Sequence, residues 1–590
     1  MINQIFSYLN RKDLSSLFFI VILVIFGNLL EILSIGTIPL LLKLAVSPLG
    51  FIDKSPIVVQ NQLNKLDYDQ SHLIIIFSLI LFFIFILKNL YLFTVHYYQQ
   101  KFFKDLRIKN SDKLLNFYFS QPYSFFLNNN PALMLRSLSS DLDLANVYIE
   151  ALLNLTKEIL IIFFIFSILL FVNTSVSLSV MIGIFFFSYL IFFTFKKKLS
   201  NLSKINFKER GKQIKIVNQI FGNIQDIKIS LKEKFFFNKF KKNIVLLKHS
   251  DFFHQLFSKV PRLIFETLAV LAIVSVIIFY MYNDRSIQDL LPLLALFGMC
   301  ALRLIPSFNQ ILISLAALKK SRVSFESIVK EFNEIKNNSY QIKLSDNLKN
   351  KNLISNNIII KNVSYKYQNT DKFVLKDINI EIKKNSSIGI IGKTGCGKST
   401  LIKIILGLLE PTSGKILADG KDIKNDLNTW YKNLSYVPQS VYLNDDSIKT
   451  NIAIGENENE ISEEKILRTI ELAGLKNFIS SLPNKLNTKV GSQGIRLSGG
   501  QMQRIGIARA LYTEPNIFIL DEATSSLDRK TEDEVINDFF KLKKNNFTII
   551  VSHRLSSLKF CNEVFFIKDG KIKDRGKIDD LILRNQDISK

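Results

Sequence analysis

The sequence is poor in residues that crosslink chains or bind transition metals. Its 590 residues include three cysteines, five histidines and one tryptophan. The cysteines at positions 300, 396 and 561 lie far apart and show no paired spacing. Disulfide frameworks and zinc sites both need such spacing, so the sequence predicts neither.

Acidic residues are also few compared with basic ones. The chain has 51 Asp and Glu against 76 Lys and Arg, which gives a formal net charge of +25. Such a surplus is typical of nucleic-acid-binding proteins and of the cytoplasmic faces of membrane proteins. No nucleic-acid motif accompanies it, and 48% of the residues are hydrophobic, including 50 Phe. We therefore expect membrane lipids, and no nucleic acid, as partners.

Long apolar runs fill the first part of the chain. A helix needs about 20 apolar residues to cross roughly 30 Å of hydrocarbon. The first run, from Leu17, is too long for a signal peptide and has no cleavage pattern, so we expect it to remain as a span. Several runs exceed the bilayer, which predicts helices that continue into the cytoplasm. The six runs are approximately 17–46, 71–98, 146–172, 174–195, 256–282 and 287–318.

The distribution of Lys and Arg predicts the orientation of these spans. The connections 99–143 and 196–259 are rich in basic residues, whereas the other connections are shorter or more neutral. Because Lys and Arg are enriched on the cytoplasmic side, both termini and both long connections are predicted to be cytoplasmic.

A phosphate-binding loop follows in the second part of the chain. It matches the pattern G-x-x-x-x-G-K-[ST] between a strand-like run, 388–391, and a helix-like run that begins near Thr400. The glycines let backbone N–H groups wrap a phosphate, Lys398 supplies a positive charge, and the Ser399 hydroxyl is placed to bind Mg²⁺. The predicted nucleotide-binding residues here are Gly392, Lys393, Thr394, Gly395, Cys396, Gly397, Lys398, Ser399 and Thr400.

Two further motifs complete the predicted chemistry. A second strand-like run, 517–520, ends in Asp521 and Glu522. The first carboxylate is suited to holding the metal, and the second to polarising an attacking water. The pentapeptide 497–501, Leu-Ser-Gly-Gly-Gln, offers a hydroxyl and glycine amides at a helix start, which is a second anion site.

In this order, the motifs from about residue 358 onward resemble the nucleotide-binding domain of ATP-binding cassette (ABC) transporters. The resemblance implies ATP and Mg²⁺ as cofactors. It implies that Tyr367 stacks on adenine, that Gln439 senses the γ-phosphate and binds the metal, and that His553 is the catalytic switch histidine. Taken singly, Tyr367 would more often be a packed aromatic residue and His553 a surface imidazole. Asp528 lies in the loop that crosses between paired cassettes of the family.

The resemblance also implies a dimer. In the family, the pentapeptide faces the nucleotide of the opposite cassette, and this chain has one phosphate loop and one pentapeptide. A homodimer would then form two identical sites. The sequence departs from the family at Ser492, where exporters usually carry an acidic residue, and this puts a detail of coupling in doubt. The resemblance implies that Ser498 and Gly500 reach the nucleotide of the other copy, and the nucleotide-binding residues predicted in the pentapeptide are Ser498, Gly499, Gly500 and Gln501.

The fold class predicted for the whole chain is an α-helical membrane domain with six transmembrane helices, fused to an α/β P-loop ATPase domain. We place the membrane domain at 1–329, a linker rich in Lys, Asn and Ser at 330–355 and the cassette at 356–590. This arrangement resembles an exporter-type half-transporter of the bacterial inner membrane. The resemblance implies short coupling helices near Gln121–Pro131 and Asn223–Lys232.

Three cations inside predicted spans are candidate substrate contacts: Lys88, Arg262 and Arg303. Ionisable residues are costly in a membrane, and these three lie at a similar depth, which favours an anion site. The alternative is structural, because long basic side chains extend to lipid phosphates and carboxylates such as Glu31 and Glu266 are available to neutralise them.

Short segments around these cations resemble flippases of lipid-linked oligosaccharides. This implies a polyprenyl-pyrophosphate glycan as cargo. An exporter of peptides or amphipathic drugs is the alternative within transporters, and an ATP-gated channel or a regulatory subunit is the alternative from another class. Glu522 argues against a channel, because gating needs nucleotide binding more than hydrolysis.

Overall fold

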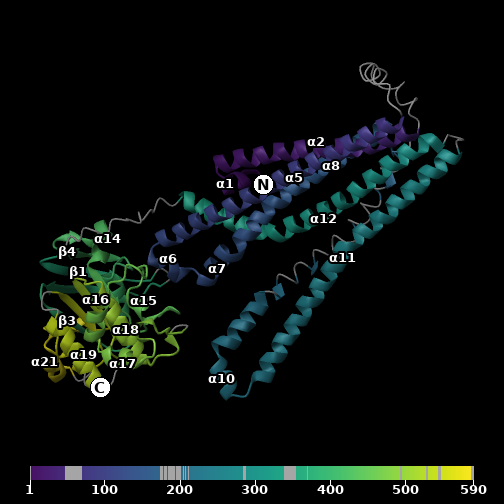
Figure 1. Ribbon diagram of the computed structural model, residues 1–590. Helices are drawn as coiled ribbons and strands as arrows, with labels where there is room; N and C mark the ends of the chain where they lie inside the picture. The colour runs from purple at the N-terminus through teal and green to yellow at the C-terminus, as the bar shows by residue number, and fades with distance from the viewer. Residues whose placement is uncertain are drawn as a thin grey trace. The chain divides into compact units, whose positions relative to one another are not determined.

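The computed structural model describes residues 2–46, 70–172, 211–282, 287–337, 354–367, 370–491, 494–526, 529–542 and 546–585, with isolated positions between 174 and 209. The chain divides into two compact units (Figure 1). The helical unit comprises residues 1–120 and 130–341, and the cassette unit comprises residues 121–129 and 342–590.

Long helices form the helical unit because the apolar runs contain few residues that break helices. A five-residue π-helical segment, Ser137–Asp141, joins α7 to α8. The helices are α1 (Ile2–Tyr8), α2 (Arg11–Val46), α5 (Gln70–Ser120), α7 (Pro131–Arg136), α8 (Leu142–Val172), α10 (Ile224–Ile229), α11 (Glu233–Tyr282) and α12 (Ile287–Asn337).

Four of the described helices are long and apolar enough to cross a membrane: Arg11–Val46, Ser71–Ser120, Leu133–Val172 and Leu290–Ile335. They coincide with four of the six predicted spans, apart from residues 287–289, and they extend beyond the apolar runs, as expected. The predicted span 256–282 lies within α11, where the apolar stretch is the shorter Glu266–Ile278. The predicted span 174–195 lies almost entirely outside the described residues.

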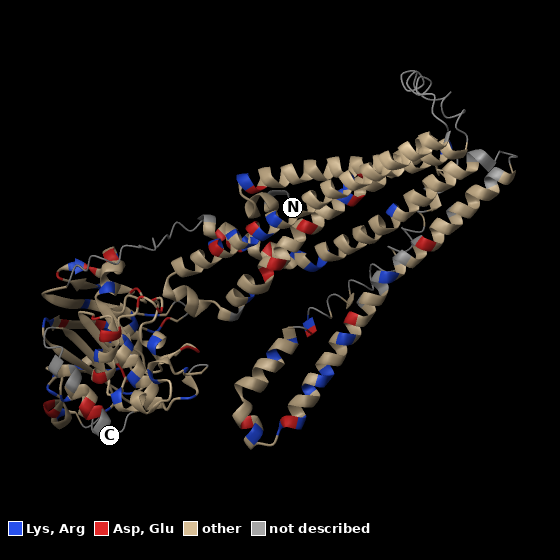
Figure 2. Cartoon of the chain, in the orientation of Figure 1, with Lys and Arg blue, Asp and Glu red and all other residues tan. Residues whose placement is uncertain are grey.

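Helices α2, α5, α8 and α12 run side by side, whereas α11 diverges from them and contacts α12 (Figure 1). Buried aliphatic side chains such as Ile161 and Ile165 of α8 fill the space between α8 and α12. The short α1 is held by Tyr8, whose ring stacks on Phe332 at 5.7 Å and whose hydroxyl donates to Asn146 at 2.7 Å. Basic residues gather on the half of α11 that is nearer to α10, and the other half is largely apolar (Figure 2).

The helical unit ends later in the sequence than predicted. We placed its end at residue 329, but α12 continues to Asn337 and the division between units falls after residue 341. The extra turns are held because Phe332 is fully buried against Tyr8. Short helices occupy both places where coupling helices were expected, as α6 (Tyr123–Asn128) and α10. Helix α6 belongs to the cassette unit although its neighbours in sequence belong to the helical unit.

Two sheets form the core of the cassette. A four-stranded antiparallel sheet has the order β2-β1-β4-β5, and a six-stranded, mostly parallel sheet has the order β10-β9-β3-β8-β7-β6. The strands are β1 (Asn357–Tyr365), β2 (Leu375–Lys383), β3 (Ser387–Ile391), β4 (Ser413–Ala418), β5 (Lys421–Asp422), β6 (Leu434–Val437), β7 (Ile517–Asp521), β8 (Phe547–Val551), β9 (Glu563–Lys568) and β10 (Lys571–Gly576).

Strands β3, β7 and β8 are buried along their whole length. Their side chains alternate between two hydrophobic clusters: Ile517 and Ile519 enter one, and Phe518 and Leu520 enter the other. Both faces of the sheet are therefore covered, which explains why these strands are continuous apolar runs in the sequence.

Helices cover these faces and begin at local capping signals. Ser447, Ser462 and Ser498 each accept a hydrogen bond from the first turn of the helix that follows. The helices are α13 (Lys398–Ile405), α14 (Leu427–Lys432), α15 (Ile448–Ile452), α16 (Glu463–Leu472), α17 (Lys476–Ser481), α18 (Gly499–Tyr512), α19 (Arg529–Leu542), α20 (Leu555–Leu558) and α21 (Ile578–Arg584).

The single tryptophan allows a test of this packing. Trp430 of α14 is 2% exposed and donates its indole N–H to the Ile405 carbonyl at 3.0 Å. We expect Trp430→Phe to lower the free energy of unfolding by about 1–3 kcal/mol, because a buried carbonyl loses its donor. The neighbouring Tyr431 is 42% exposed and donates to the Gly407 carbonyl, so Tyr431→Phe should change it by less than about 0.5 kcal/mol. If calorimetry gives the same shift in unfolding temperature for Trp430→Phe and Tyr431→Phe, the structural role given to the Trp430 hydrogen bond is wrong.

Candidate functional site

The phosphate-binding loop connects β3 to α13 as predicted. Gly397 precedes α13 with φ of 107°, and a Cβ there would lie 2.8 Å from the Leu375 side chain and 3.0 Å from the Val374 carbonyl. Only glycine satisfies both the conformation and the space. No side chain caps the N-terminus of α13, so its first N–H groups are available to a phosphate.

Lys398 is folded into this loop. Its ammonium group donates to the carbonyls of Gly392 at 2.7 Å and Lys393 at 3.1 Å, and the residue is 6% exposed. Ser399 is exposed, whereas Thr400 is buried and its hydroxyl lies 3.1 Å from the Tyr367 hydroxyl. Tyr367 therefore lies beside α13, and its contact with adenine stays a prediction.

Asp521 ends strand β7 and is 8% exposed. Its Oδ2 accepts a hydrogen bond from the Tyr436 hydroxyl at 3.2 Å. Burial raises the pKa of the Asp521 carboxyl, and the neighbouring Glu522 acts in the same direction, while Tyr436 and the Lys398 ammonium oppose the shift. Burial and the Asp521 carboxylate raise the pKa of the Tyr436 phenol, so it stays a donor at neutral pH.

Glu522, Gln439 and His553 come together from three separate loops. Glu522 Oε2 accepts from the Gln439 amide at 2.6 Å, and its Oε1 lies 3.1 Å from His553 Nε2. The Glu522 backbone has φ of 49°, a conformation that costs about 1–3 kcal/mol for a residue other than glycine. Its N–H donates to the Val551 carbonyl at 2.8 Å, which holds the residue in this conformation.

The loop after Glu522 is held by residues that the motifs did not identify. Gln503 of α18 donates to the Ser525 hydroxyl at 3.0 Å and accepts from the Ser526 N–H at 2.9 Å. Arg554 donates to the Ser525 carbonyl at 2.5 Å. The sequence offers one signal for these two residues, which is that they lie close to recognised motifs. Gln503 lies two residues after the pentapeptide, and Arg554 directly follows His553.

Glu532 anchors the same loop from α19 and is 1% exposed. It accepts hydrogen bonds from the Thr524 and Ser557 hydroxyls, both at 2.7 Å, and from Arg554 at 2.8 Å. Burial alone would raise the pKa of Glu532, but these hydrogen bonds and the Arg554 charge outweigh it and lower the pKa.

The pentapeptide begins helix α18. Ser498 Oγ accepts from the Gln501 N–H at 3.2 Å, and the Gln501 side chain accepts from the Ser498 N–H at 2.9 Å, which forms a capping box. Ser498 and Gly499 are exposed, and Gly500 is half-buried. The predicted Asp528 and the unusual Ser492 lie outside the described residues.

These residues fit Mg²⁺ and ATP. The N–H groups at the start of α13 and the Lys398 ammonium suit a polyphosphate, and the buried Asp521 carboxylate, the Ser399 hydroxyl and the Gln439 side chain provide the oxygen ligands that Mg²⁺ prefers.

Comparison with known proteins assigns both halves of the chain to a family. Residues 375–525 match the family described as ABC transporter, and residues 13–302 match the family described as ABC transporter transmembrane region. Both halves of the chain belong to the ABC transporter family. The cassette is therefore an ATP-binding domain, and Mg²⁺ is the usual partner of its nucleotide.

Similar curated proteins match about two fifths of the chain. Human ATP-binding cassette sub-family B member 5 is 38% identical over 234 residues, which is 39% of this chain and 18% of that protein. The leukotoxin translocation ATP-binding protein LktB of a Pasteurella haemolytica-like species is 38% identical over 236 residues, 40% of this chain and 33% of that protein. The alpha-hemolysin translocation ATP-binding protein HlyB of Escherichia coli is 40% identical over 230 residues, 39% of this chain and 32% of that protein. This chain thus spans a third or less of each relative.

A solved structure of a bacterial Atm1-family ABC exporter with ATP bound has the same fold. The TM-score is 0.69 at 19% identity, and the match covers 95% of this chain and 96% of that chain. The fold class predicted from the sequence, a helical membrane domain fused to an ABC ATPase domain, is confirmed.

Arg303, predicted as a possible substrate contact, is paired with carboxylates inside the helical unit. Its Nε lies 2.7 Å from Glu31 Oε1 on α2, and its guanidinium lies 3.6 Å from Glu158 Oε2 on α8. It also donates to the Ser307 hydroxyl at 3.2 Å. The side chains of Glu31 and Glu158 are 15% and 7% exposed. This geometry agrees with the structural alternative for Arg303, in which Glu31 neutralises it.

The other two predicted cations, Lys88 and Arg262, lie on α5 and α11. The Lys88 ammonium lies 4.4 Å from the centroid of the Phe85 ring on its own helix. Helix α11 contains Arg262, whose side chain lies outside the described part of the chain. Of the three predicted cations, the structure thus describes Arg303 in a cluster with carboxylates and Lys88 beside an aromatic ring.

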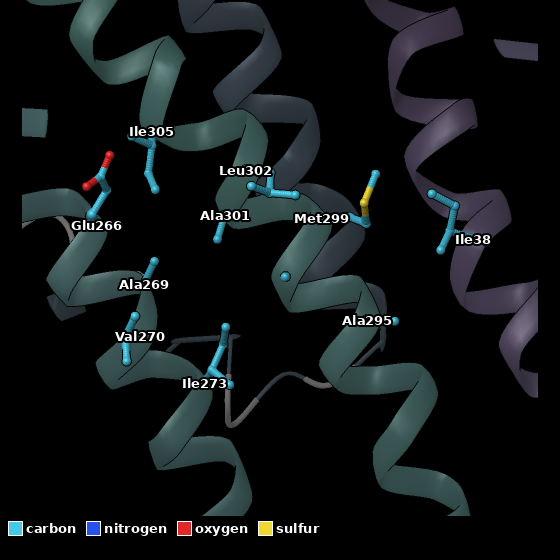
Figure 3. A pocket seen from close by; sticks show the side chains of 11 residues that line it. Ile38, Glu266, Ala269, Val270, Ile273, Ala295, Met299, Ala301, Leu302 and Ile305 are labelled. Atoms are coloured by element: carbon cyan, nitrogen blue, oxygen red, sulfur yellow. The ribbon is translucent and has the colours of Figure 1, made fainter.

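A pocket of about 530 Å³ lies between α2, α11 and α12 of the helical unit (Figure 3). Small and aliphatic side chains line it, including Ile273, Ala295 and Leu302, and Glu266 is the charged residue among its lining residues. A volume of this order is usual for sites that bind small apolar or amphipathic molecules.

The buried Glu532 network should make stability depend on pH. Because its pKa is lowered on folding, Glu532 stabilises the native state above its unfolded pKa of about 4.3, and this contribution is lost as the pH falls further. We expect Glu532→Gln to lower the free energy of unfolding by about 3 kcal/mol at pH 7, with a smaller loss near pH 4. Thermal unfolding at both pH values measures this, with the exposed Glu534→Gln as control. If the difference in stability between the wild type and Glu532→Gln is the same at both pH values, the proposed role of the Glu532 carboxylate is wrong.

Proposed function

We propose that this chain is a half-transporter that assembles as a homodimer and uses ATP hydrolysis to export an amphipathic substrate across a membrane. The observation that carries the proposal is the joint position of Gln439, Glu522 and His553 beside the phosphate-binding loop of an ABC cassette. The helical unit matches the transmembrane region of the same family. This match supports the proposal that the energy of ATP hydrolysis drives transport.

A second copy would complete each ATP site. Lys398, Asp521 and Glu522 would hold and hydrolyse the nucleotide from one copy. The exposed start of α18, with Ser498 and Gly499, would approach its γ-phosphate from the other. The exposure of this helix start in the single chain supports the assignment, because the capping box uses the N–H groups of Ser498 and Gln501 and leaves those of Gly499 and Gly500 for an anion.

Each residue of the site would have a distinct role. Glu522 would polarise the attacking water, with His553 and Gln439 orienting its two carboxylate oxygens. Bound Mg²⁺ would neutralise charge on the phosphates, held by Ser399, Asp521 and Gln439.

We also propose the membrane orientation and location. The Lys and Arg on the half of α11 near α10 support a cytoplasmic position for this end of the helices (Figure 2). The termini and the cassette would lie on the same side. A bacterial inner membrane suits an ATP-dependent exporter of this type, since ATP is available on the cytoplasmic face.

Two classes of cargo remain in the proposal. A lipid-linked oligosaccharide is the cargo predicted from the sequence, and its support is now reduced to Lys88 and Arg262, because Arg303 is paired with Glu31 and Glu158. The alternative, a peptide or an amphipathic drug, is favoured by the mainly aliphatic pocket. It is also in line with relatives named for translocating leukotoxin and hemolysin.

The hydrolytic role of Glu522 is testable directly. Replacement by Gln keeps the size and the contact with Gln439 but removes the carboxylate that polarises water. We expect Glu522→Gln to bind ATP and to lower ATP hydrolysis by at least about 100-fold, as measured by phosphate release. The exposed Glu464→Gln serves as control. If ion conductance depends on ATP and persists in the Glu522→Gln protein, the chain acts as a nucleotide-gated channel and the transport proposal is wrong.

The cargo is best tested by substrate-stimulated ATP hydrolysis in proteoliposomes. A polyprenyl-pyrophosphate glycan, an amphipathic peptide and an amphipathic dye would be compared at equal concentrations. If the cargo is a lipid-linked oligosaccharide, the glycan should stimulate hydrolysis and Lys88→Ala with Arg262→Ala should abolish this stimulation. The exposed Lys104→Ala, also on α5, should not. Stimulation by the peptide or dye alone would favour the alternative cargo.

A further inference from the structure

Tyr436 occupies a position that the motifs do not assign. It lies in β6, three residues before Gln439, and is aligned with Ile519 on the parallel neighbour β7. Because side chains alternate along a strand, Asp521 is on the same face of β7 as Ile519, one step further along. Tyr436 and Asp521 are therefore diagonal neighbours on one face of the sheet, and the Tyr436 hydroxyl donates to Asp521 Oδ2 at 3.2 Å.

This hydrogen bond orients a carboxylate that has little other support. Asp521 is 8% exposed, and among the described residues Tyr436 is the one that hydrogen-bonds to its side chain. With Oδ2 held by the phenol, the Asp521 carboxylate has a fixed rotation, and Oδ1 remains for a metal. Partners of this kind around a metal ligand commonly change metal affinity by tenfold or more.

Tyr436 and helix α6 share one hydrophobic cluster. Tyr123, the first residue of α6, and Tyr436 pack against the same hydrophobic cluster, and Tyr123 is close enough to act electrostatically on the Tyr436 phenol. The Lys403 ammonium of α13 lies 5.8 Å from the centroid of the Tyr123 ring and is among the charges that act on Asp521. A shared hydrophobic cluster, the Lys403–Tyr123 approach and the Tyr436–Asp521 hydrogen bond therefore lie between α6 and the carboxylate of Asp521.

Helix α6 is also the point where the two units of the chain are joined by sequence. It packs within the cassette unit, but α5 before it and α7 after it belong to the helical unit. Tyr123 is therefore three residues from the end of α5, in the segment that connects the two units.

From these contacts we propose that Tyr436 is a positioning residue for the metal-binding carboxylate Asp521 and that it links this carboxylate to helix α6 through Tyr123. The inference rests on the proposed use of Mg²⁺ and ATP, and it adds a route by which the position of α6 sets metal affinity.

The test is metal affinity in the full-length protein. Mn²⁺ binding in the presence of a non-hydrolysable ATP analogue would be measured by electron paramagnetic resonance. We expect Tyr436→Phe, which removes only the hydroxyl, to weaken Mn²⁺ binding roughly tenfold while nucleotide binding in EDTA stays unchanged. At limiting Mg²⁺ the variant should hydrolyse ATP more slowly, and saturating Mg²⁺ should restore the rate. Tyr431→Phe loses a hydroxyl bonded to a backbone carbonyl elsewhere in the cassette and should behave as the wild type.

The link to α6 requires a second set of variants. Tyr123→Ala should weaken Mn²⁺ binding in the wild-type background but add little in the Tyr436→Phe background, because both changes break the same route. Leu127→Ala, on the exposed side of α6, is the control. Additive effects of Tyr123→Ala and Tyr436→Phe would overturn the link.

Failure of this inference is distinguishable from failure of the proposed function. If wild-type protein binds the nucleotide and Mn²⁺ but Tyr436→Phe binds Mn²⁺ equally well, the positioning role is wrong and the ATP site stands. If the wild-type protein binds neither, the proposed function itself is wrong.

Discussion

Burial of the parallel strands of the cassette on both faces is the constraint on which the site depends. Strands β3, β7 and β8 alternate their side chains between two hydrophobic clusters, so a shift of one residue would move each strand's entire apolar set to the wrong cluster. The register is therefore fixed. Because the strands are parallel, their carboxyl ends meet at one edge, which brings the phosphate-binding loop, Glu522 and His553 together from distant parts of the sequence.

The details of the site follow from hydrogen bonds that this edge makes possible. Pairing of Asp521 with Val551 between β7 and β8 lets the Glu522 N–H reach the Val551 carbonyl, and this holds Glu522 in its left-handed conformation. Gln503 and Arg554 then fix the loop that follows. The strained backbone conformation of Glu522 is tolerated because the surrounding hydrogen bonds hold the residue in it.

In the helical unit, charge pairing decides which ionisable residues are available to a substrate. Arg303 lies between Glu31 and Glu158 and joins α2, α8 and α12. Removing one partner of such a buried group is costly, so the cluster serves the packing of the bundle before it serves recognition. The pocket between α2, α11 and α12 is lined mainly by small and aliphatic side chains, and its chemistry suits the apolar part of a cargo.

The sequence by itself determined the class of the protein, since the motifs of the cassette and four of the apolar spans are local patterns set by glycine conformations, helix caps and residue periodicity. It also named Lys398, Asp521, Glu522, Gln439 and His553. Only the tertiary structure decided the partners of Arg303, the network of Gln503, Glu532 and Arg554, and the contact of Tyr436 with Asp521. These depend on strand register and helix packing, which join residues far apart in the chain, and no local pattern encodes such contacts.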